Sequence, residues 1–189
     1  MIERFLLATG NPGKAAELAR LLGCAVQPIP GWEAPPEDGA TFLDNARIKA
    51  RAGAARCPGE WVVADDSGIE VDALDGAPGV HSARYGGDDL DDAGRVDALL
   101  AAMAGRADRT ARFRCVLVAI GPDGREVVAD GALEGRLAEA PRGDGGFGYD
   151  PVLIPAGETR TCGELSADEK NAISHRGAAA RALRDTLGL

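Results

Sequence analysis

A short glycine loop near the start of the chain has the residues to bind phosphate. The loop, TGNPGK, runs from Thr9 to Lys14 and directly follows an apolar run. Backbone N–H groups of such a loop, placed ahead of a helix, can approach a phosphate closely. The loop is not a complete P-loop, because Ala8 and Ala15 replace the first glycine and the magnesium-binding hydroxyl of G-x-x-x-x-G-K-S/T. Any metal ion would therefore have to be held by residues elsewhere.

Two adjacent aspartates, Asp65 and Asp66, are the leading candidates for a metal site. They end the apolar run WVVA and precede a Ser-Gly pair. Carboxylates suit a hard cation such as Mg²⁺. Neighbouring side chains on a strand point to opposite faces, so we expect one aspartate to meet the metal and the other to brace the following turn. The preceding loop offers Glu37, or Asp38, as a second ligand, and an aspartate pair that only caps a turn is the alternative.

The chain uses lysine sparingly. Only three of its 21 basic residues are lysines, at Lys14, Lys49 and Lys170. Where arginine is the usual cation, a lysine can serve as the compact point charge that suits phosphate. Chance placement on solvated helix faces is the alternative that the sequence leaves open.

Two segments in the second half of the chain have residues suited to a nucleoside. Glycines around Phe147 leave its ring face open for stacking, although a glycine loop around a core aromatic fits the same sequence. A continuous helix over 166–177 would place His175 about 140° and Arg176 about 120° from Lys170, on opposite sides. The three can serve one ligand only if the helix breaks, and Ser174 is a natural N-cap for a second helix.

Length, charge and cysteine content narrow the class of protein. The 189 residues predict a single domain, 1–189, that can bury a substantial core. The formal net charge of −9 argues against a general nucleic-acid binder, which needs a basic face. Four scattered cysteines predict reduced thiols rather than disulfides or a zinc site. No signal peptide or membrane span is expected, so we predict a soluble, cytoplasmic protein.

The elements that must position these residues alternate between helix and strand. The expected strands are 4–9, 61–74 (ending in the aspartates and a glycine turn), 111–120 and 125–138, the last two as a hairpin. The expected helices are 14–23 (stopped by Gly23), 41–57 (with a Thr41–Asp44 capping box), 90–103 and one within 166–187. Early alternation followed by a hairpin predicts an α/β fold with a mixed sheet.

Five segments together resemble those of the non-canonical purine nucleoside triphosphate pyrophosphatase family, also called the inosine triphosphate pyrophosphatase or HAM1-like family. In chain order they are LATGNPGK, GATFLDNARIKA, ADDSGIEVDALDGAPGVHSARYGG, GGFGYDPVLIP and EKNAISHRG. They follow the family's order and rough spacing and cover nearly the whole chain. The resemblance implies an elongated mixed β-sheet flanked by helices, two lobes with a central substrate cleft, and a homodimer.

The resemblance also implies Mg²⁺-dependent hydrolysis of ITP, dITP and XTP to the monophosphate and pyrophosphate, which removes deaminated purines from the nucleotide pool. By match to the family motifs, Asp66 would be metal ligand and proton acceptor, and Glu37, or Asp38, the second acidic ligand. The implied substrate-binding residues are Thr9, Gly10, Asn11, Pro12, Gly13, Lys14, Lys49, Ser67, Phe147, Gly148, Tyr149, Asp150, Lys170, His175 and Arg176. His81 stays without a role in the chemistry, and a structural part in the GAPGVHSARY turn is expected.

Three alternatives accompany this expectation. A Maf-like pyrophosphatase shares the general fold, but the SHRG and GGFGYDP segments argue against it. A nucleotide-binding switch or kinase with a degenerate P-loop would release or transfer the γ-phosphate. A non-catalytic sensor would bind ITP with Mg²⁺ and not turn it over.

Overall fold

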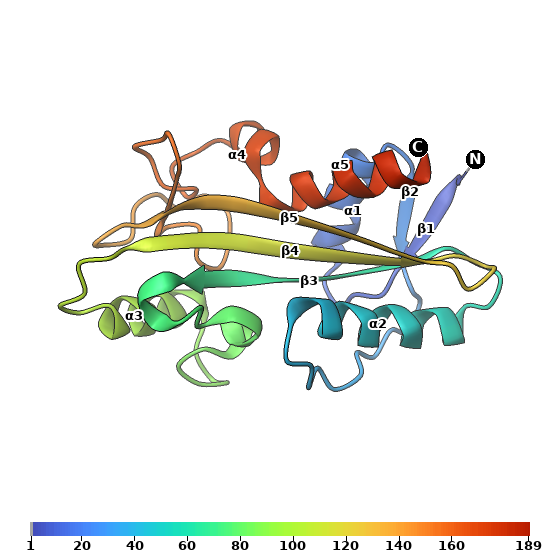
Figure 1. The fold of residues 1–189 in the computed structure, drawn as a ribbon, viewed down its shortest axis with the longest axis horizontal. Coiled ribbons are helices and arrows are strands. Elements are labelled where there is room, and N and C mark those ends of the chain that lie inside the picture. Colours follow the sequence, from blue (N-terminus) through green and yellow to red (C-terminus); the bar gives the residue numbers. More distant parts are fainter. Residues whose placement is uncertain (1) are drawn as a thin grey trace. The chain divides into compact units, whose positions relative to one another are not determined.

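The structure, a computed structural model, describes residues 2–189, and Pro12 through its backbone alone (Figure 1). The described residues form strands, α-helices and two 3-10 helices, which are in chain order β1 (Arg4–Leu7), α1 (Pro12–Leu22), β2 (Ala25–Pro28), α2 (Phe42–Arg56), β3 (Val62–Val71), η1 (Asp72–Leu74), η2 (Gly79–Arg84), α3 (Asp92–Ala102), β4 (Thr110–Ile120), β5 (Glu126–Leu137), β6 (Leu153–Pro155), α4 (Ala167–Ile173) and α5 (His175–Leu187). None of the helices among these residues has both the length and the apolar character needed to cross a membrane.

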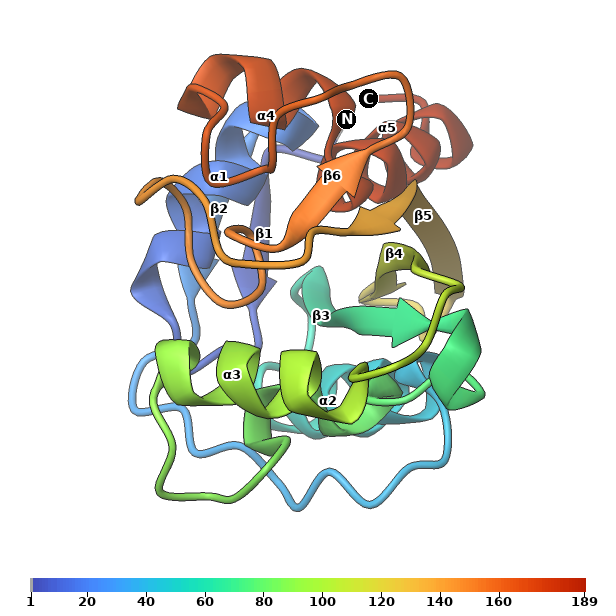
Figure 2. The same cartoon turned by 90° about the vertical axis from the view of Figure 1, so that its left-hand side faces the viewer.

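The strands form one mixed sheet in the order β2-β1-β3-β4-β5-β6. Strand β1 is parallel to β2 and β3, whereas β5 and β6 are antiparallel and lie side by side in Figure 2. The predicted α/β fold with a mixed sheet is therefore confirmed. Strands β2 and β6 were not predicted, because runs of four and three residues carry too little pattern of their own.

Contacts within the chain divide it into two compact units. Unit 1 comprises Met1–Asp66, Cys115–Gly131 and Arg176–Leu189, and unit 2 comprises Ser67–Arg114 and Ala132–His175. The division falls within β3, β4 and β5, so both units share these strands. A single domain over 1–189 stays a prediction.

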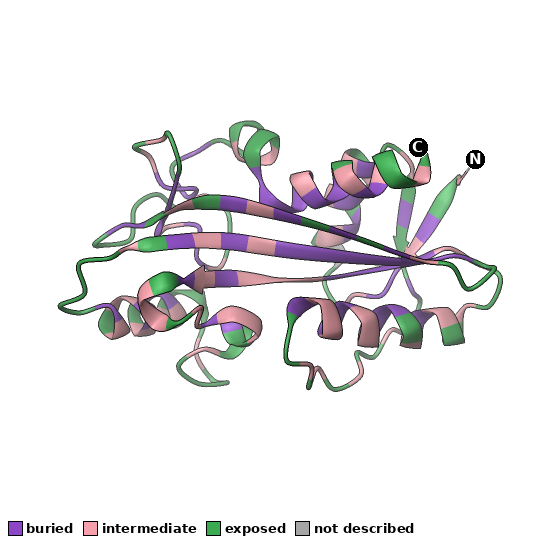
Figure 3. Ribbon diagram, in the orientation of Figure 1, coloured by how far each residue is buried: buried purple, intermediate pink, exposed green. Residues whose placement is uncertain are grey.

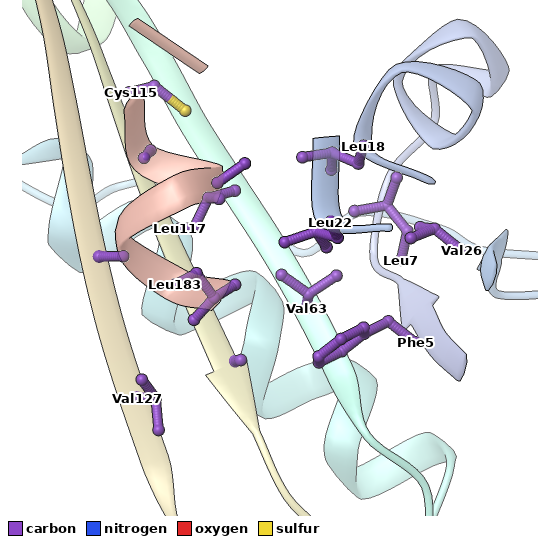
Figure 4. Close-up of a cluster of buried hydrophobic side chains, with 14 of the residues drawn as sticks. Phe5, Leu7, Leu18, Leu22, Val26, Val63, Cys115, Leu117, Val127 and Leu183 are labelled. Carbon is purple, nitrogen blue, oxygen red and sulfur yellow. The ribbon is translucent and has the colours of Figure 1, made fainter. Parts of the chain in front are cut away.

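In unit 1, helices α1 and α5 pack on one face of the strands. Leu18 and Leu22 of α1 and Leu183 of α5 share a buried cluster with Val63 and Leu117 (Figure 4). The spacing of the α1 leucines puts them on one helix face, which explains why the apolar pattern of this segment predicted a helix. Gly23 ends α1 in the left-handed conformation, as predicted.

Helix α2 lies on the opposite face of the unit 1 strands (Figure 1). Gly53 allows the close approach, since a Cβ at this residue would lie 2.8 Å from Cγ1 of Val62. Buried residues recur every three or four positions along the helix, with half-buried and a few exposed residues between them (Figure 3). The predicted capping box is present, because Thr41 Oγ1 accepts from the Asp44 N–H and Asp44 Oδ2 accepts from the Thr41 N–H, both at 3.1 Å.

Strand β3 departs from its prediction in one respect. It continues from Val62 to Val71 without interruption, so the glycine turn expected after Asp66 is wrong. Ile69 and Val71 are fully buried in the core of unit 2. Their alternation extends the strand through Ser67 and Gly68, and this burial outweighs the turn preference of a Ser-Gly pair.

In unit 2, helix α3 packs its apolar face on the strands. Val96 and Leu99 of α3 share a buried cluster with Ile69, Phe113 and Leu137. Towards the C-terminus, the structure forms two helices, α4 and α5, in place of one. Ser174 lies between them in an extended conformation. The break at Ser174, which the positions of Lys170, His175 and Arg176 had required for one site, is confirmed.

Candidate active site

A cavity of about 260 Å³ in unit 1 gathers most of the residues predicted to bind phosphate. Its lining residues are Ala8, Thr9, Gly10, Asn11, Lys14, Trp32, Ala34, Glu37, Lys49 and Asp65. Pro12 and Gly13, also predicted, form the first turn of α1. The loop before α1, the loop before α2 and strand β3 therefore meet at one cavity, although they are separated in the sequence.

Residues 9–14, the predicted phosphate loop, are ordered by the side chains of Thr9 and Asn11. Thr9 Oγ1 accepts from the N–H of Asn11 at 3.0 Å, and Asn11 Oδ1 accepts from the N–H of Gly13 at 2.9 Å. Asn11 is thus the N-cap of α1, which begins two residues before the predicted start. A helix N-terminus carries unpaired N–H groups and a partial positive charge, so it suits a phosphate group.

Asp65 holds two cations on the α1 and α5 face of β3. The carboxylate is 1% exposed and accepts from Lys14 Nζ at 2.8 and 3.1 Å, and Arg176 Nη2 lies 3.6 Å away. Arg176 also donates to Glu17 at 3.0 Å. Burial alone would raise the pKa of Asp65, but Lys14 and Arg176 bring it well below the usual range. The expectation that this aspartate braces a turn is therefore wrong.

Asp66 faces the opposite way, toward α2, as the alternation of a strand predicts. Lys49 Nζ lies 3.2 Å from Asp66 Oδ1 and 2.7 Å from Glu37 Oε2, and Asn45 donates to Asp66 Oδ2 at 3.3 Å. Burial raises the pKa of Asp66, and Lys49 opposes this only in part. Burial would lower the pKa of Lys49, but Asp66 and Glu37 raise it above its ordinary value, so Lys49 is charged.

The carboxylates around Lys49 fit a divalent cation such as Mg²⁺. The ammonium group bridges Glu37 and Asp66, so both carboxylates already face one cation, and Glu37 rather than Asp38 makes this contact. Among the described residues, no three His, Cys, Asp or Glu side chains gather into a metal cluster. Mg²⁺ commonly takes one or two carboxylates and completes its shell with water and substrate phosphates. The donor set therefore fits Mg²⁺ that completes its shell with water or with phosphate oxygens.

Unit 2 contains the aromatic residue predicted to stack on a base. Phe147 is 57% exposed, in agreement with the predicted open face. Lys170 Nζ lies 4.8 Å from the ring centroid and 2.5 Å from Asp150 Oδ2. The same Asp150 oxygen accepts from the N–H of Phe147 at 2.8 Å. Asp150 therefore fixes both the loop that carries Phe147 and the lysine beside the ring.

Other predicted residues of unit 2 make contacts that order the protein itself. The buried Tyr149 hydroxyl donates to the carbonyl of Ser82 at 2.8 Å, and the N–H of Gly148 donates to Asp92 Oδ2 at 2.8 Å. The ring of His175 is buried, with its centroid 5.0 Å from that of Phe113. These contacts hold the 143–150 loop and the start of α5 in fixed positions.

The remaining predicted residues lie at the surface or within β3. Ser67 is half-buried in β3. His81 is exposed in η2, where its Nδ1 lies 3.0 Å from Arg84 Nη2, so it stays outside the candidate site.

Sequence reasoning missed Trp32 and Asn45. Trp32 lines the unit 1 cavity, and its buried indole N–H has no hydrogen-bond partner among the residues that the structure describes. It lies in a loop without periodicity, so no local signal identified it. Asn45 had such a signal, because it precedes Lys49 by four residues and so shares its helix face.

The chain is similar to known proteins in sequence and in fold. A sequence profile of the Ham1 family matches residues 5–186. The dITP/XTP pyrophosphatase of Streptomyces coelicolor is 51% identical over an alignment of 199 positions, which covers 98% of this chain and 99% of the relative. The structure of a HAM1 protein from Coxiella burnetii is similar with a TM-score of 0.90 and 40% identity, over 100% of this chain and 99% of that chain.

A second solved structure gives the same result. The nucleoside-triphosphatase / dITP/XTP pyrophosphatase from Mycobacterium abscessus is 44% identical with a TM-score of 0.80, over 98% of this chain and 100% of that chain. The family match includes the phosphate loop, both aspartates and nearly all of α5. By sequence and by fold, the chain belongs to the Ham1 family.

Proposed function

We propose that this protein hydrolyses non-canonical purine nucleoside triphosphates, namely ITP, dITP and XTP, to the nucleoside monophosphate and pyrophosphate. It would thereby cleanse the nucleotide pool of deaminated purines. The observation that carries the proposal is the pair of carboxylates, Glu37 and Asp66, that face one cation beside the phosphate loop. Relatives about half identical to this chain and named dITP/XTP pyrophosphatase support the substrate class.

Mg²⁺ is the proposed cofactor, with Glu37 and Asp66 as its ligands. When bound, it would bridge phosphate oxygens and offset the charge that develops as the bond breaks. The side chains around the cavity carry a net negative charge, which supports the proposal of an added cation. Four carboxylates (Glu17, Glu37, Asp65 and Asp66) outnumber three cations (Lys14, Lys49 and Arg176). A triphosphate, itself strongly negative, requires an added cation here.

The proposed chemistry is attack of water on the α-phosphorus, with Asp66 accepting the proton. Burial raises the pKa of Asp66 and so makes its carboxylate a better base. Lys14 and Lys49 would stabilise the departing pyrophosphate with fixed positive charge. An ammonium group has three N–H bonds, so Lys14 can keep its contact with Asp65, and Lys49 its contacts with Glu37 and Asp66, while each still donates to a phosphate oxygen.

The nucleoside is proposed to bind through Ser67, the 147–150 loop, Lys170, His175 and Arg176. The exposed ring of Phe147 is suited to stacking on a purine. His175 and Arg176 would donate to the 6-oxo group, and Arg176 would exchange a contact with Glu17 or Asp65 to do so. Adenine has an amine in place of the oxygen, so the donors would lack a partner, and such sites can discriminate by roughly 10⁴.

We propose in addition that the protein works in the cytoplasm as a homodimer, as the family resemblance implies. All four cysteines are free thiols in the structure, which suits a reducing compartment. Size-exclusion chromatography with light scattering should give twice the mass of one chain. A mass of one chain at micromolar concentration would contradict the dimer.

The experiment that tests the function is product analysis with purified protein and Mg²⁺. ITP, dITP and XTP should give pyrophosphate and the monophosphate, whereas ATP and GTP should be nearly inert. Asp66→Asn should abolish turnover, and Asp185→Asn, the same change at an exposed position of α5, should not. Orthophosphate as the product, or equal turnover of ATP, would overturn the proposal and favour a switch or kinase.

A further inference from the structure

Asn45 links the strand and the loop that carry the two carboxylates of the candidate metal site, and it is not itself one of the ligands. It lies in α2 with 1% of its surface exposed, which is rare for an asparagine. Its Nδ2 donates to Asp66 Oδ2 at 3.3 Å, and its Oδ1 accepts from the N–H of Gly39 at 2.9 Å. Gly39 belongs to the loop that carries Glu37. One buried amide therefore bonds to the strand with one ligand and to the loop with the other.

The orientation of this amide follows from the chemistry of its partners. A backbone N–H can only donate and a carboxylate can only accept, so the oxygen of Asn45 must face Gly39 and its nitrogen must face Asp66. An aspartate at this position would accept from Gly39 but repel Asp66. A leucine of similar size would make neither hydrogen bond. Of these three side chains, only the amide satisfies both contacts.

The loop backbone packs directly on the amide. A Cβ added at Gly39 would lie 2.6 Å from Asn45 Oδ1 and 2.6 Å from the Cβ of Asp44, closer than real Cβ atoms come. The residue must therefore be glycine for the N–H to reach the amide oxygen. This close contact places the loop on α2 and brings Glu37, two residues earlier, to Lys49 at 2.7 Å.

Helix geometry explains how α2 presents both Asn45 and Lys49 to Asp66. Asn45 and Lys49 are four residues apart, so they lie on the same face of α2. Lys49 binds one oxygen of Asp66 and Asn45 binds the other. Both oxygens of this carboxylate are therefore oriented by neighbouring side chains of α2.

We propose that Asn45 is a positioning residue for the divalent cation, which sets the orientation of Asp66 and the place of the Glu37 loop. The inference rests on the proposed function only in taking Glu37 and Asp66 as the cation's ligands. Residues that orient metal ligands typically contribute about 10- to 100-fold to metal affinity. Asn45 touches neither substrate nor cation in this assignment.

The test is titration of the full-length protein with Mn²⁺ alone, by calorimetry or electron paramagnetic resonance, without nucleotide. Asn45→Leu should weaken Mn²⁺ binding at least tenfold. Gly39→Ala should do the same while keeping the amide, because its methyl group displaces the loop. Gln27→Leu, which removes an exposed amide from β2, is the matched control and should bind Mn²⁺ as the wild-type protein does.

Kinetics supply a second readout that a general loss of structure would not give. In both variants the Mg²⁺ concentration for half-maximal ITP turnover should rise at least tenfold, while KM for ITP at saturating Mg²⁺ changes less than about twofold. Wild-type Mn²⁺ affinity in either variant would overturn the assignment. If Asn45→Leu does not fold, Gly39→Ala decides alone. Mn²⁺ binding without ITP hydrolysis by the wild-type protein would instead contradict the proposed function and leave this inference standing.

Discussion

Two adjacent aspartates of identical chemistry have different environments because a strand sends them to opposite faces. Asp65 meets Lys14 and Arg176, and its pKa is held well below the usual range. Asp66 contacts Lys49 and Asn45, but burial has the larger effect, so its pKa is raised. The first is suited to hold cations in place and the second to accept a proton.

Asp65→Asn should lower the free energy of unfolding at pH 7 by about 3 kcal/mol, because two cations lose their buried partner. A depressed folded pKa means that the carboxylate stabilises the fold above the unfolded value of about 3.9, and that this stabilisation is lost as the pH falls further. The difference between variant and wild type should therefore shrink by about 1 kcal/mol between pH 7 and pH 3.

Urea denaturation at both pH values measures this difference. Asp185→Asn, at an exposed position of α5, is the control and should match the wild type at each pH. A constant difference between Asp65→Asn and wild type at pH 7 and pH 3 would show that Asp65 does not titrate as its contacts imply.

At the scale of elements, the helix ends were the most predictable features of the chain. Their signals are local: Gly23 ends α1, Thr41 begins α2 and Ser174 separates α4 from α5. Strands β2 and β6 were not predictable, because their partners rather than their own few residues define them. The turn expected after Asp66 failed for a related reason, since burial of Ile69 in unit 2 decided the backbone there.

The same distinction applies to the candidate site. The residue types of the phosphate loop, the aspartate pair and the three lysines were evident in the sequence. Their pairing was not, because Asp65 and Arg176 come from distant segments that only the fold brings within 3.6 Å. Trp32 lines the cavity from a loop whose position depends on the same packing.

The capping box of α2 provides a test at this scale, since α2 carries both Asn45 and Lys49. Thr41→Ala removes the acceptor of the Asp44 N–H and should lower the free energy of unfolding by about 1 kcal/mol. Thr41→Ser keeps a hydroxyl and should lose only a fraction of that. Chemical denaturation of the two variants beside the wild type measures the effect. Equal losses would mean that the methyl group of Thr41, not the cap, stabilises the helix.

At the scale of the whole molecule, the distribution of lysine sets the candidate site apart from the rest of a strongly acidic chain. With 30 acidic and 21 basic residues, the net charge of −9 opposes the approach of a polyanion. All three lysines pair with carboxylates of the candidate site: Lys14 with Asp65, Lys49 with Asp66 and Glu37, and Lys170 with Asp150. This distribution favours a requirement for the ammonium group at these three positions over chance placement of the lysines.

Single replacement of each lysine by arginine tests that idea, because it keeps the net charge at −9 and changes only the shape of the cation. The guanidinium is wider than an ammonium group and has its donors in a fixed plane, so it cannot take the place of the ammonium groups beside these carboxylates without displacing their neighbours. We expect kcat/KM for ITP to fall roughly tenfold or more in Lys14→Arg, Lys49→Arg and Lys170→Arg. Arg51→Lys, at a side chain 68% exposed on α2, should keep wild-type activity. If the three lysine variants also kept it while remaining folded by circular dichroism, positive charge alone would suffice, and the scarcity of lysine elsewhere in the chain would carry no information about the site.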